Sequence, residues 1–179
     1  MKGFCISFLI IAIIVLSVAG ICLVPSTPKT EYLRIHVRAD SNDDCDQAVK
    51  LLVKDAVVEY LTPFIAECDT KKKAENMLKD RLGGIEEVAR EVLTEKGFTY
   101  GCKASIKNEK FPTRKYGALS LESGFYDALI LELGSGKGDN WWCVVYPPLC
   151  FTGEKGVGYE YRSKIKEIID EFYEKKGEK

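Results

Sequence analysis

The chain is poor in histidine, the residue whose unperturbed pKa lies nearest neutrality and which acid–base catalysis and zinc binding most often use. Its 179 residues include a single histidine, His36, and neither a Cys-x-x-Cys nor a His-x-x-x-His pair, so no zinc site can be assembled from the sequence. The formal net charge is −1 and there is no basic tract, which argues against nucleic acid as a partner. We therefore expect the chain to bind no metal, cofactor, small-molecule substrate or nucleic acid.

A phosphate-binding loop is also missing, although glycines cluster in the sequence GSGKG at residues 134–138. A Walker loop requires a further glycine well before its Gly-Lys pair and a serine or threonine directly after it. Leu131 and Gly138 occupy those two positions, so the magnesium-binding hydroxyl is absent. We interpret the cluster as a tight reversal between two strands, in which glycine supplies positive φ angles.

An apolar run of 22 residues extends from Gly3 to Val24 and is long enough to cross a bilayer as a helix. A cleaved signal peptide usually has a shorter apolar region followed by a small-x-small site, which the sequence SVA at residues 17–19 provides. Both interpretations stay open: residues 1–24 are a signal peptide or a transmembrane anchor.

Charge beside this run indicates its orientation. Lys2 and the amino terminus lie on one flank, whereas Lys29 and Glu31 offset each other on the other, so the bulk of the chain is expected outside the cytoplasm. Residues 25–30 are predicted to be a short linker, and residues 31–179 are expected to form one extracytoplasmic domain with a sizeable core.

Hydrophobic periodicity predicts the elements of that domain. Residues 32–37 alternate like a half-buried strand, with Leu33, Ile35 and Val37 on one face. Helical stripes follow at residues 49–64 and 74–92, where Gly83-Gly84 is expected to bend or divide the second helix. Gly97 is placed as a helix C-cap before a strand at residues 98–107.

Further strands are predicted around residues 116–121 and at residues 126–133 and 141–146, and the last two are expected to form a hairpin. Tyr161, Ile165, Ile168, Ile169 and Phe172 mark a terminal helix. This order predicts an α+β fold in which helices pack on one face of a mostly antiparallel sheet, preceded by the N-terminal apolar helix.

The two cysteines of the last strand and its corner are separated by six residues. Cys143 and Cys150 flank the Pro-Pro corner, which can bring their Cα atoms within disulfide range. An oxidising compartment favours that bond, although two buried thiols remain an alternative. His36 together with either cysteine would suit an extracytoplasmic cysteine hydrolase, but a histidine on the polar face of a strand is more often structural.

Three stretches closely resemble the stage II sporulation protein R family: residues 33–57, residues 124–151 and, more loosely, the amphipathic tail from Tyr159. The first reads LRIHVRADSNDDCDQAVKLLVKDAV and the second GFYDALILELGSGKGDNWWCVVYPPLCF. We take Arg34, His36 and Asn140 as residues of the family motif. The resemblance covers most of residues 31–179.

This resemblance implies a signal made in the forespore and exported across the inner forespore membrane into the intermembrane space, where it is free or anchored. It implies that the chain activates a membrane-embedded aspartic protease, which then processes the precursor of the mother-cell sigma factor E. By this analogy the chain is a protein ligand and not an enzyme. The cysteine hydrolase and a passive wall-binding domain remain the alternatives.

The aromatic, conformationally fixed segment around the last strand is the predicted contact surface for that protease. Adjacent tryptophans point to opposite faces of a strand, and a partly exposed tryptophan is a common binding hot spot. The residues of this predicted partner-binding surface are Trp141, Trp142, Tyr146, Pro147, Pro148 and Phe151.

Overall fold

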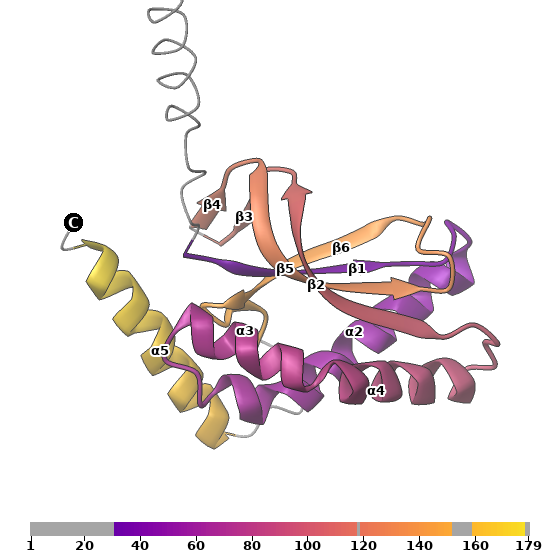
Figure 1. The fold of residues 1–179 in the computed structure, drawn as a ribbon, viewed down its shortest axis with the longest axis horizontal. Coiled ribbons are helices and arrows are strands. Elements are labelled where there is room, and N and C mark those ends of the chain that lie inside the picture. The colour runs from indigo at the N-terminus through magenta and orange to yellow at the C-terminus, as the bar shows by residue number, and fades with distance from the viewer. Residues whose placement is uncertain (1–30, 118, 152–158, 178–179) are drawn as a thin grey trace, which may run out of the picture.

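Residues 31–117, 119–151 and 159–177 are described by the computed structural model (Figure 1). The predicted signal or anchor segment and the linker lie outside these residues. Within the described ranges, no helix combines the length and apolar character needed to span a membrane. The elements in chain order are β1 (Leu33–Arg38), α2 (Asp44–Ile65), α3 (Lys71–Asp80), α4 (Leu82–Glu95), β2 (Cys102–Phe111), β3 (Arg114–Tyr116), β4 (Leu119–Leu121), β5 (Gly124–Leu133), β6 (Asn140–Tyr146), η1 (Leu149–Phe151) and α5 (Tyr159–Gly177).

The predicted α+β class is confirmed, with a mixed main sheet. Its strand order is β2-β5-β1-β6, and β3 pairs with β4 in a separate two-stranded sheet. β1 runs parallel to β5 and antiparallel to β6, while β2 and β5 are antiparallel. The first strand of the domain therefore lies in the interior of the sheet, between two strands from the end of the sequence.

The predicted hairpin of β5 and β6 is wrong, because β1 lies between these two strands. Their connection passes over the end of β1 and bonds to it: the Gly138 amide donates to the Ala39 carbonyl at 2.9 Å, and the Ser135 hydroxyl donates to the Asp40 carbonyl at 2.9 Å. Gly134 and Gly136 have φ of 55° and 63°, so the glycines supply the left-handed positions that the reversal needs.

Three helices, α2, α3 and α4, cover one face of the main sheet (Figure 1). The Thr70 hydroxyl accepts a bond from the Lys73 amide and so caps α3. The chain divides α3 from α4 at Arg81, two residues before the predicted break, and Gly97 follows α4 with φ of 82°. This helical layer buries the apolar side of β1, where Leu33, Ile35 and Val37 are 0–1% exposed.

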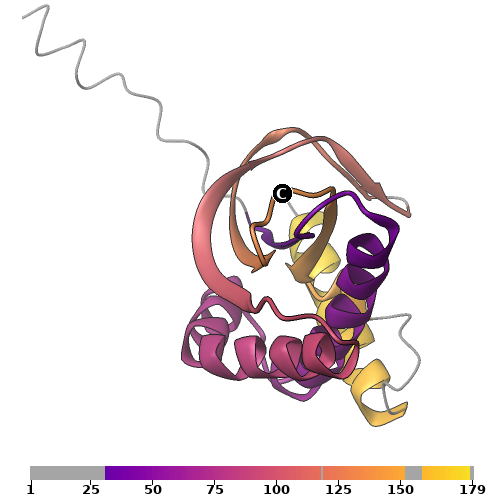
Figure 2. The same ribbon diagram turned by 90° about the vertical axis from the view of Figure 1, so that its right-hand side faces the viewer.

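The opposite face of the sheet is also buried, because the sheet curls into an arch (Figure 2). β2 and β6 are its two edges, which would lie about 14 Å apart in a flat four-stranded sheet. Phe111 of β2 and Trp142 of β6 nevertheless contact each other, with ring centroids 4.8 Å apart. The expectation of a half-buried first strand is therefore wrong: Arg34 and His36 on the second face of β1 are 0% and 1% exposed.

The terminal helix α5 packs at one end of the domain (Figure 1), against α2 and η1. Ile165 is buried, and Ile168, Ile169 and Phe172 are half-buried. Phe172 contacts two tyrosines, Tyr32 and Tyr146, with ring centroids 5.5 and 5.9 Å away. These contacts attach α5 to one end of the strand pair β1–β6, where the start of β1 lies opposite the end of β6. The side chain of Tyr161 lies outside the described residues.

Candidate functional site

The polar face of β1 forms a cluster of charged and aromatic side chains beneath the arch of the sheet. Arg34, His36 and Arg38 occupy alternate positions of β1 and point to the face opposite the helices, as the alternation predicted. The aromatic rings around them come from β2, β3, β5 and β6. We call these residues the arch cluster: Arg34, His36, Arg38, Glu109, Phe111, Tyr116, Tyr126, Glu132 and Trp142.

Arg34 is a fully buried cation enclosed by aromatic rings. Its guanidinium carbon lies 4.2 Å from the ring centroid of Phe111, 4.8 Å from that of Tyr126 and 5.8 Å from that of Tyr116. Its Nη2 donates to the Tyr116 hydroxyl at 2.7 Å. Its Nε and Nη1 have no hydrogen-bond partner among the described residues, so cation–π attraction is a main compensation for removing this charge from water.

His36 is stacked between aromatic rings and held neutral. Its imidazole lies parallel to Trp142, with centroids 3.6 Å apart and an interplanar angle of 21°, and meets the edge of Phe111. Burial lowers the pKa of His36; Arg38 acts in the same direction, and Asn140 and Glu109 oppose the shift only in part. The imidazole is therefore uncharged near neutral pH.

Arg38 links three strands through ion pairs at the mouth of the arch. Its Nη1 donates to Glu132 of β5 at 2.7 Å, and its Nη2 pairs with Glu109 of β2. The Nδ1 of His36 lies 3.5 Å from the same Glu109 carboxylate. Because these carboxylates are about a quarter exposed, the network closes the arch while remaining in contact with solvent.

Because His36 is the only histidine of the chain, the contribution of this cluster to stability can be tested by changing the pH. A buried histidine whose folded-state pKa is lowered stabilises the fold fully only above its unfolded pKa of about 6.5, and this stability is lost as the pH falls from there through the lowered value. We expect the free energy of unfolding, measured by urea titration, to decrease between about pH 7 and about pH 5 in the wild type. The carboxyl groups with lowered pKa, Asp46, Asp69 and Glu75, act at more acidic pH.

The control for this measurement is His36→Gln, which has the size of histidine but no ionisation in that range. Its free energy of unfolding is expected to be lower than that of the wild type at pH 7 but nearly independent of pH over the same interval. An equal pH slope in both proteins would assign the acid sensitivity to other groups.

The predicted partner-binding residues divide into a buried and a partly exposed set. Tyr146 and Phe151 are 6% and 1% exposed, and Pro147 and Pro148 are also buried. Their side chains pack the corner after β6 and leave little surface for a partner. Trp141 and Trp142 remain partly exposed, on opposite faces of β6 as predicted: Trp141 toward the helices, with the Lys54 ammonium 5.4 Å from its ring, and Trp142 in the arch cluster.

Cys143 and Cys150 form a disulfide, with Cα atoms 6.1 Å apart. Neither sulfur is then available as a thiolate nucleophile. Cys143 belongs to the helix side of β6, whereas His36 belongs to the arch side of β1, so the sheet separates the base from the proposed nucleophile. The geometry gives the cysteine-hydrolase alternative no support.

Chemistry at the remaining polar groups is limited. Among the described residues, no three histidine, cysteine, aspartate or glutamate side chains gather as metal ligands do. The free thiols of Cys68 and Cys102 have raised pKa, to about 12 for Cys102, mainly because burial disfavours the thiolate. The described side chains of the arch cluster pack as a polar and aromatic core beneath the sheet.

Sequence reasoning found one side of this cluster and missed the other. Arg34, His36 and Trp142 were identified, but Glu109, Glu132 and the aromatic residues Phe111, Tyr116 and Tyr126 were not. The signal was available only in part: β2 continues four residues beyond the predicted end at Lys107, and this extension carries Glu109 and Phe111 over the face of β1.

Comparison with known proteins identifies the family. The sequence model of stage II sporulation protein R matches residues 29–156. Stage II sporulation protein R of Bacillus subtilis (strain 168) is 32% identical over 127 residues, which are 71% of this chain and 57% of that protein. The chain thus spans little more than half the length of this relative, and no solved structure matches significantly. The matched region contains the whole arch cluster and the disulfide, and the chain belongs to the stage II sporulation protein R family.

Proposed function

We propose that this chain is an exported or membrane-anchored sporulation signal that activates a membrane-embedded aspartic protease, which then processes the precursor of the mother-cell sigma factor E. The observation that carries the proposal is the family match over residues 29–156. The chain acts as a protein ligand: its binding favours the active state of the receptor protease, and it performs no chemistry itself.

Three features of the chain support an extracytoplasmic ligand. The apolar run of residues 3–24 directs export or anchoring. The disulfide is of the kind that persists in oxidising compartments. The arch cluster and the corner after β6 fix the domain through buried contacts, and a preorganised surface binds with a smaller loss of conformational entropy.

Reconstitution tests the proposal. The full chain, the candidate membrane protease and the sigma-factor precursor are co-expressed in a non-sporulating host, and precursor cleavage is followed by immunoblot. We expect cleavage only when the chain is present and the protease is active. Controls lack the chain, carry a protease with its catalytic aspartates replaced, or retain the chain in the cytoplasm by deletion of residues 1–24. Absence of cleavage with all three proteins present and the chain exported would refute the proposal.

Trp141 is the residue of the predicted contact surface that the fold leaves most suited to a partner. Both tryptophans belong to the edge strand β6. The ring of Trp142 packs against the rings of His36 and Phe111, whereas the ring of Trp141 contacts the Lys54 ammonium on the other face of the sheet. β6 is an edge strand of the main sheet, a position at which a partner chain can approach. Trp141→Ala is expected to reduce precursor cleavage at least tenfold, as loss of a tryptophan hot spot does.

Phe125 provides the matched control for this prediction. It is an aromatic residue on β5 that is 58% exposed, so its removal tests whether any loss of exposed aromatic surface impairs signalling. Phe125→Ala is expected to leave cleavage unchanged. Equal cleavage with Trp141→Ala and wild-type chain, both secreted in equal amounts, would place the contact surface elsewhere.

A further inference from the structure

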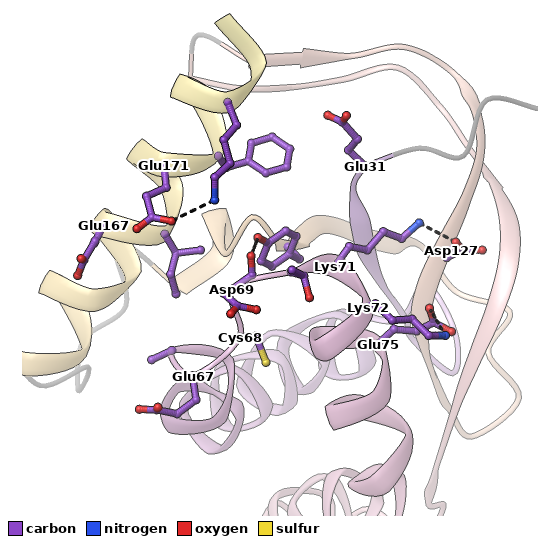
Figure 3. A pocket seen from close by; sticks show the side chains of 16 residues that line it. Glu31, Glu67, Cys68, Asp69, Lys71, Lys72, Glu75, Asp127, Glu167 and Glu171 are labelled. Atoms are coloured by element: carbon purple, nitrogen blue, oxygen red, sulfur yellow. Dashed lines mark hydrogen bonds and ion pairs between the residues drawn. The ribbon is translucent and has the colours of Figure 1, made fainter. Parts of the chain in front are cut away.

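A pocket of about 840 Å³ lies between α5 and the segment that joins α2 to α3 (Figure 3). One wall is the face of α5 that carries Glu167, Glu171 and Lys175. The opposite wall is formed by residues 66–72 with Glu75 and by Asp127 of β5, and Glu31 stands at the rim where the described chain begins. The pocket is separate from the arch cluster, since none of its lining residues belongs to that cluster.

The lining of this pocket is predominantly anionic. Seven carboxylates and three lysines line it. Each lysine is held by one of those carboxylates: Lys71 by Asp127 at 2.7 Å, Lys72 by Glu75 at 3.5 Å and Lys175 by Glu171 at 3.4 Å. Asp69 pairs with Lys73, which lies outside the pocket. The carboxylates of Glu31 and Glu167 make no ion pair within the described part of the chain, so negative charge remains on the α5 wall and at the rim.

The floor of the pocket is apolar and fixed. Ala66, Cys68 and Tyr146 are 5–6% exposed, and Ile168 and Phe172 of α5 are half-buried beside them. The Tyr146 hydroxyl donates to the Asp69 carbonyl at 2.6 Å, which anchors the loop between α2 and α3 to β6. Phe172 packs against Tyr146 and fixes the α5 wall.

An apolar floor beneath an anionic rim suits a long cationic side chain. Lysine and arginine bury their aliphatic stems along apolar surface while their charged ends remain at a polar rim. A metal ion fits less well, because the carboxylates are spread over two walls and no three possible ligands gather in the described residues. Free nucleotides and other anions are disfavoured by the excess of carboxylates.

We infer that this pocket receives a lysine or arginine side chain from an extracytoplasmic loop of the partner protein. The inference deepens the proposed function and rests on it for the identity of the partner. The basic side chain lies with its stem on Tyr146 and Phe172 and its charge between Glu31 and Glu167. The partner thus contacts the domain at the end from which the chain emerges, in addition to the edge strand that carries Trp141.

Charge reversal on the α5 wall tests the pocket. Glu167→Lys replaces a lining carboxylate, and Glu174→Lys makes the same change on the same helix at an exposed residue that does not line the pocket. Two readouts are used on the full chain in mild detergent: binding of a fluorescein-labelled Leu-Arg-Leu-Arg peptide, with Leu-Glu-Leu-Glu as the control peptide, and precursor cleavage in the reconstituted system. Circular dichroism establishes that both variants are folded.

We expect Glu167→Lys to weaken binding of the arginine peptide about tenfold at low salt and to reduce cleavage, while Glu174→Lys changes neither. Peptide binding that is equal in both variants, or no stronger than that of the glutamate peptide, overturns the pocket assignment. The two proposals can fail separately. If the peptide binds in the pocket but the wild-type chain causes no precursor cleavage, the protease-activating function is refuted and the pocket assignment stands. If cleavage occurs and Glu167→Lys does not change it, the pocket assignment is refuted and the function stands.

Discussion

Replacing Arg34 by alanine is expected to lower the free energy of unfolding by about 3 kcal/mol, because the change leaves a large cavity and removes the partner of a partly buried hydroxyl. The guanidinium fills the space between Phe111, Tyr116 and Tyr126 and donates to the Tyr116 hydroxyl. Burial raises the pKa of Tyr116, and Arg34 opposes that shift, so the hydroxyl stays protonated and loses its partner in the variant. Urea unfolding of the purified full chain in mild detergent measures the effect.

Two further variants separate charge from volume. Arg34→Met keeps much of the side-chain volume without the charge, and we expect it to recover a large part of the lost stability, since apolar replacement of a buried charge is often tolerated. Arg81→Ala removes a second arginine–aromatic contact, 3.8 Å from the Phe64 centroid but partly exposed to solvent, and should cost less than about 1 kcal/mol. If Arg34→Ala and Arg81→Ala lowered the free energy of unfolding equally, the enclosure of Arg34 by aromatic rings would contribute nothing to stability.

Alternation along β1 predicted which residues share a face but not that both faces are buried. Leu33, Ile35 and Val37 lie toward the helices, as the two-residue period requires. The opposite face carries two arginines and a histidine, which in a single sequence indicate exposure to solvent. Their burial depends on β2 and β5 curving over β1, and this curvature arises from contacts between residues more than seventy positions apart, such as Arg38 with Glu109. Local periodicity contains no record of such contacts.

The prediction of a β5–β6 hairpin failed for a related reason. Short connections between consecutive strands favour hairpins, and the glycines of residues 134–138 fit a tight reversal. The β1 strand nevertheless inserts between β5 and β6, and bonds from Gly138 and Ser135 to residues 39 and 40 carry the connection over its end. In this position the backbone groups of β1 form hydrogen bonds with a strand on each side. The two-residue alternation of side chains is the same in an edge strand and in an interior strand, so it could not predict this position.

The candidate site was predictable where chemistry is local and not where it depends on packing. Cys143 and Cys150 lie close in sequence across a rigid corner, and the structure joins them. The aromatic corner itself was interpreted as a contact surface, yet Pro147, Pro148 and Phe151 are buried. An aromatic, proline-rich segment has the same composition whether it forms a core or an interface, so only the fold distinguishes Trp141 from its neighbours.

Substitution of Gly138 by alanine is the second change for which we expect a large loss, about 3 kcal/mol or more of the free energy of unfolding. A methyl group at this position would overlap the backbone carbonyl of Ser41 and contact Ala39. Backbone atoms cannot rotate away as a flexible side chain does, and the Gly138 amide is itself bonded to the Ala39 carbonyl. Relief of the overlap therefore requires that the connection separate from the end of β1, which also loosens the start of α2.

Gly83→Ala is the matched control, because nothing lies within 4 Å of a Cβ atom added there. Gly83 lies in the first turn of α4, where alanine is the better helix former, so this variant is expected to gain up to about 1 kcal/mol. Thermal unfolding of both variants under one condition gives the comparison. If Gly138→Ala were as stable as the wild type, the close contact between the β5–β6 connection and the end of β1 would not contribute to stability. The position of β1 between β5 and β6 would then depend on other contacts. A large loss at Gly138 together with a gain at Gly83 would instead show that the glycine is required by the close approach of two chain segments, and not by the flexibility of a turn.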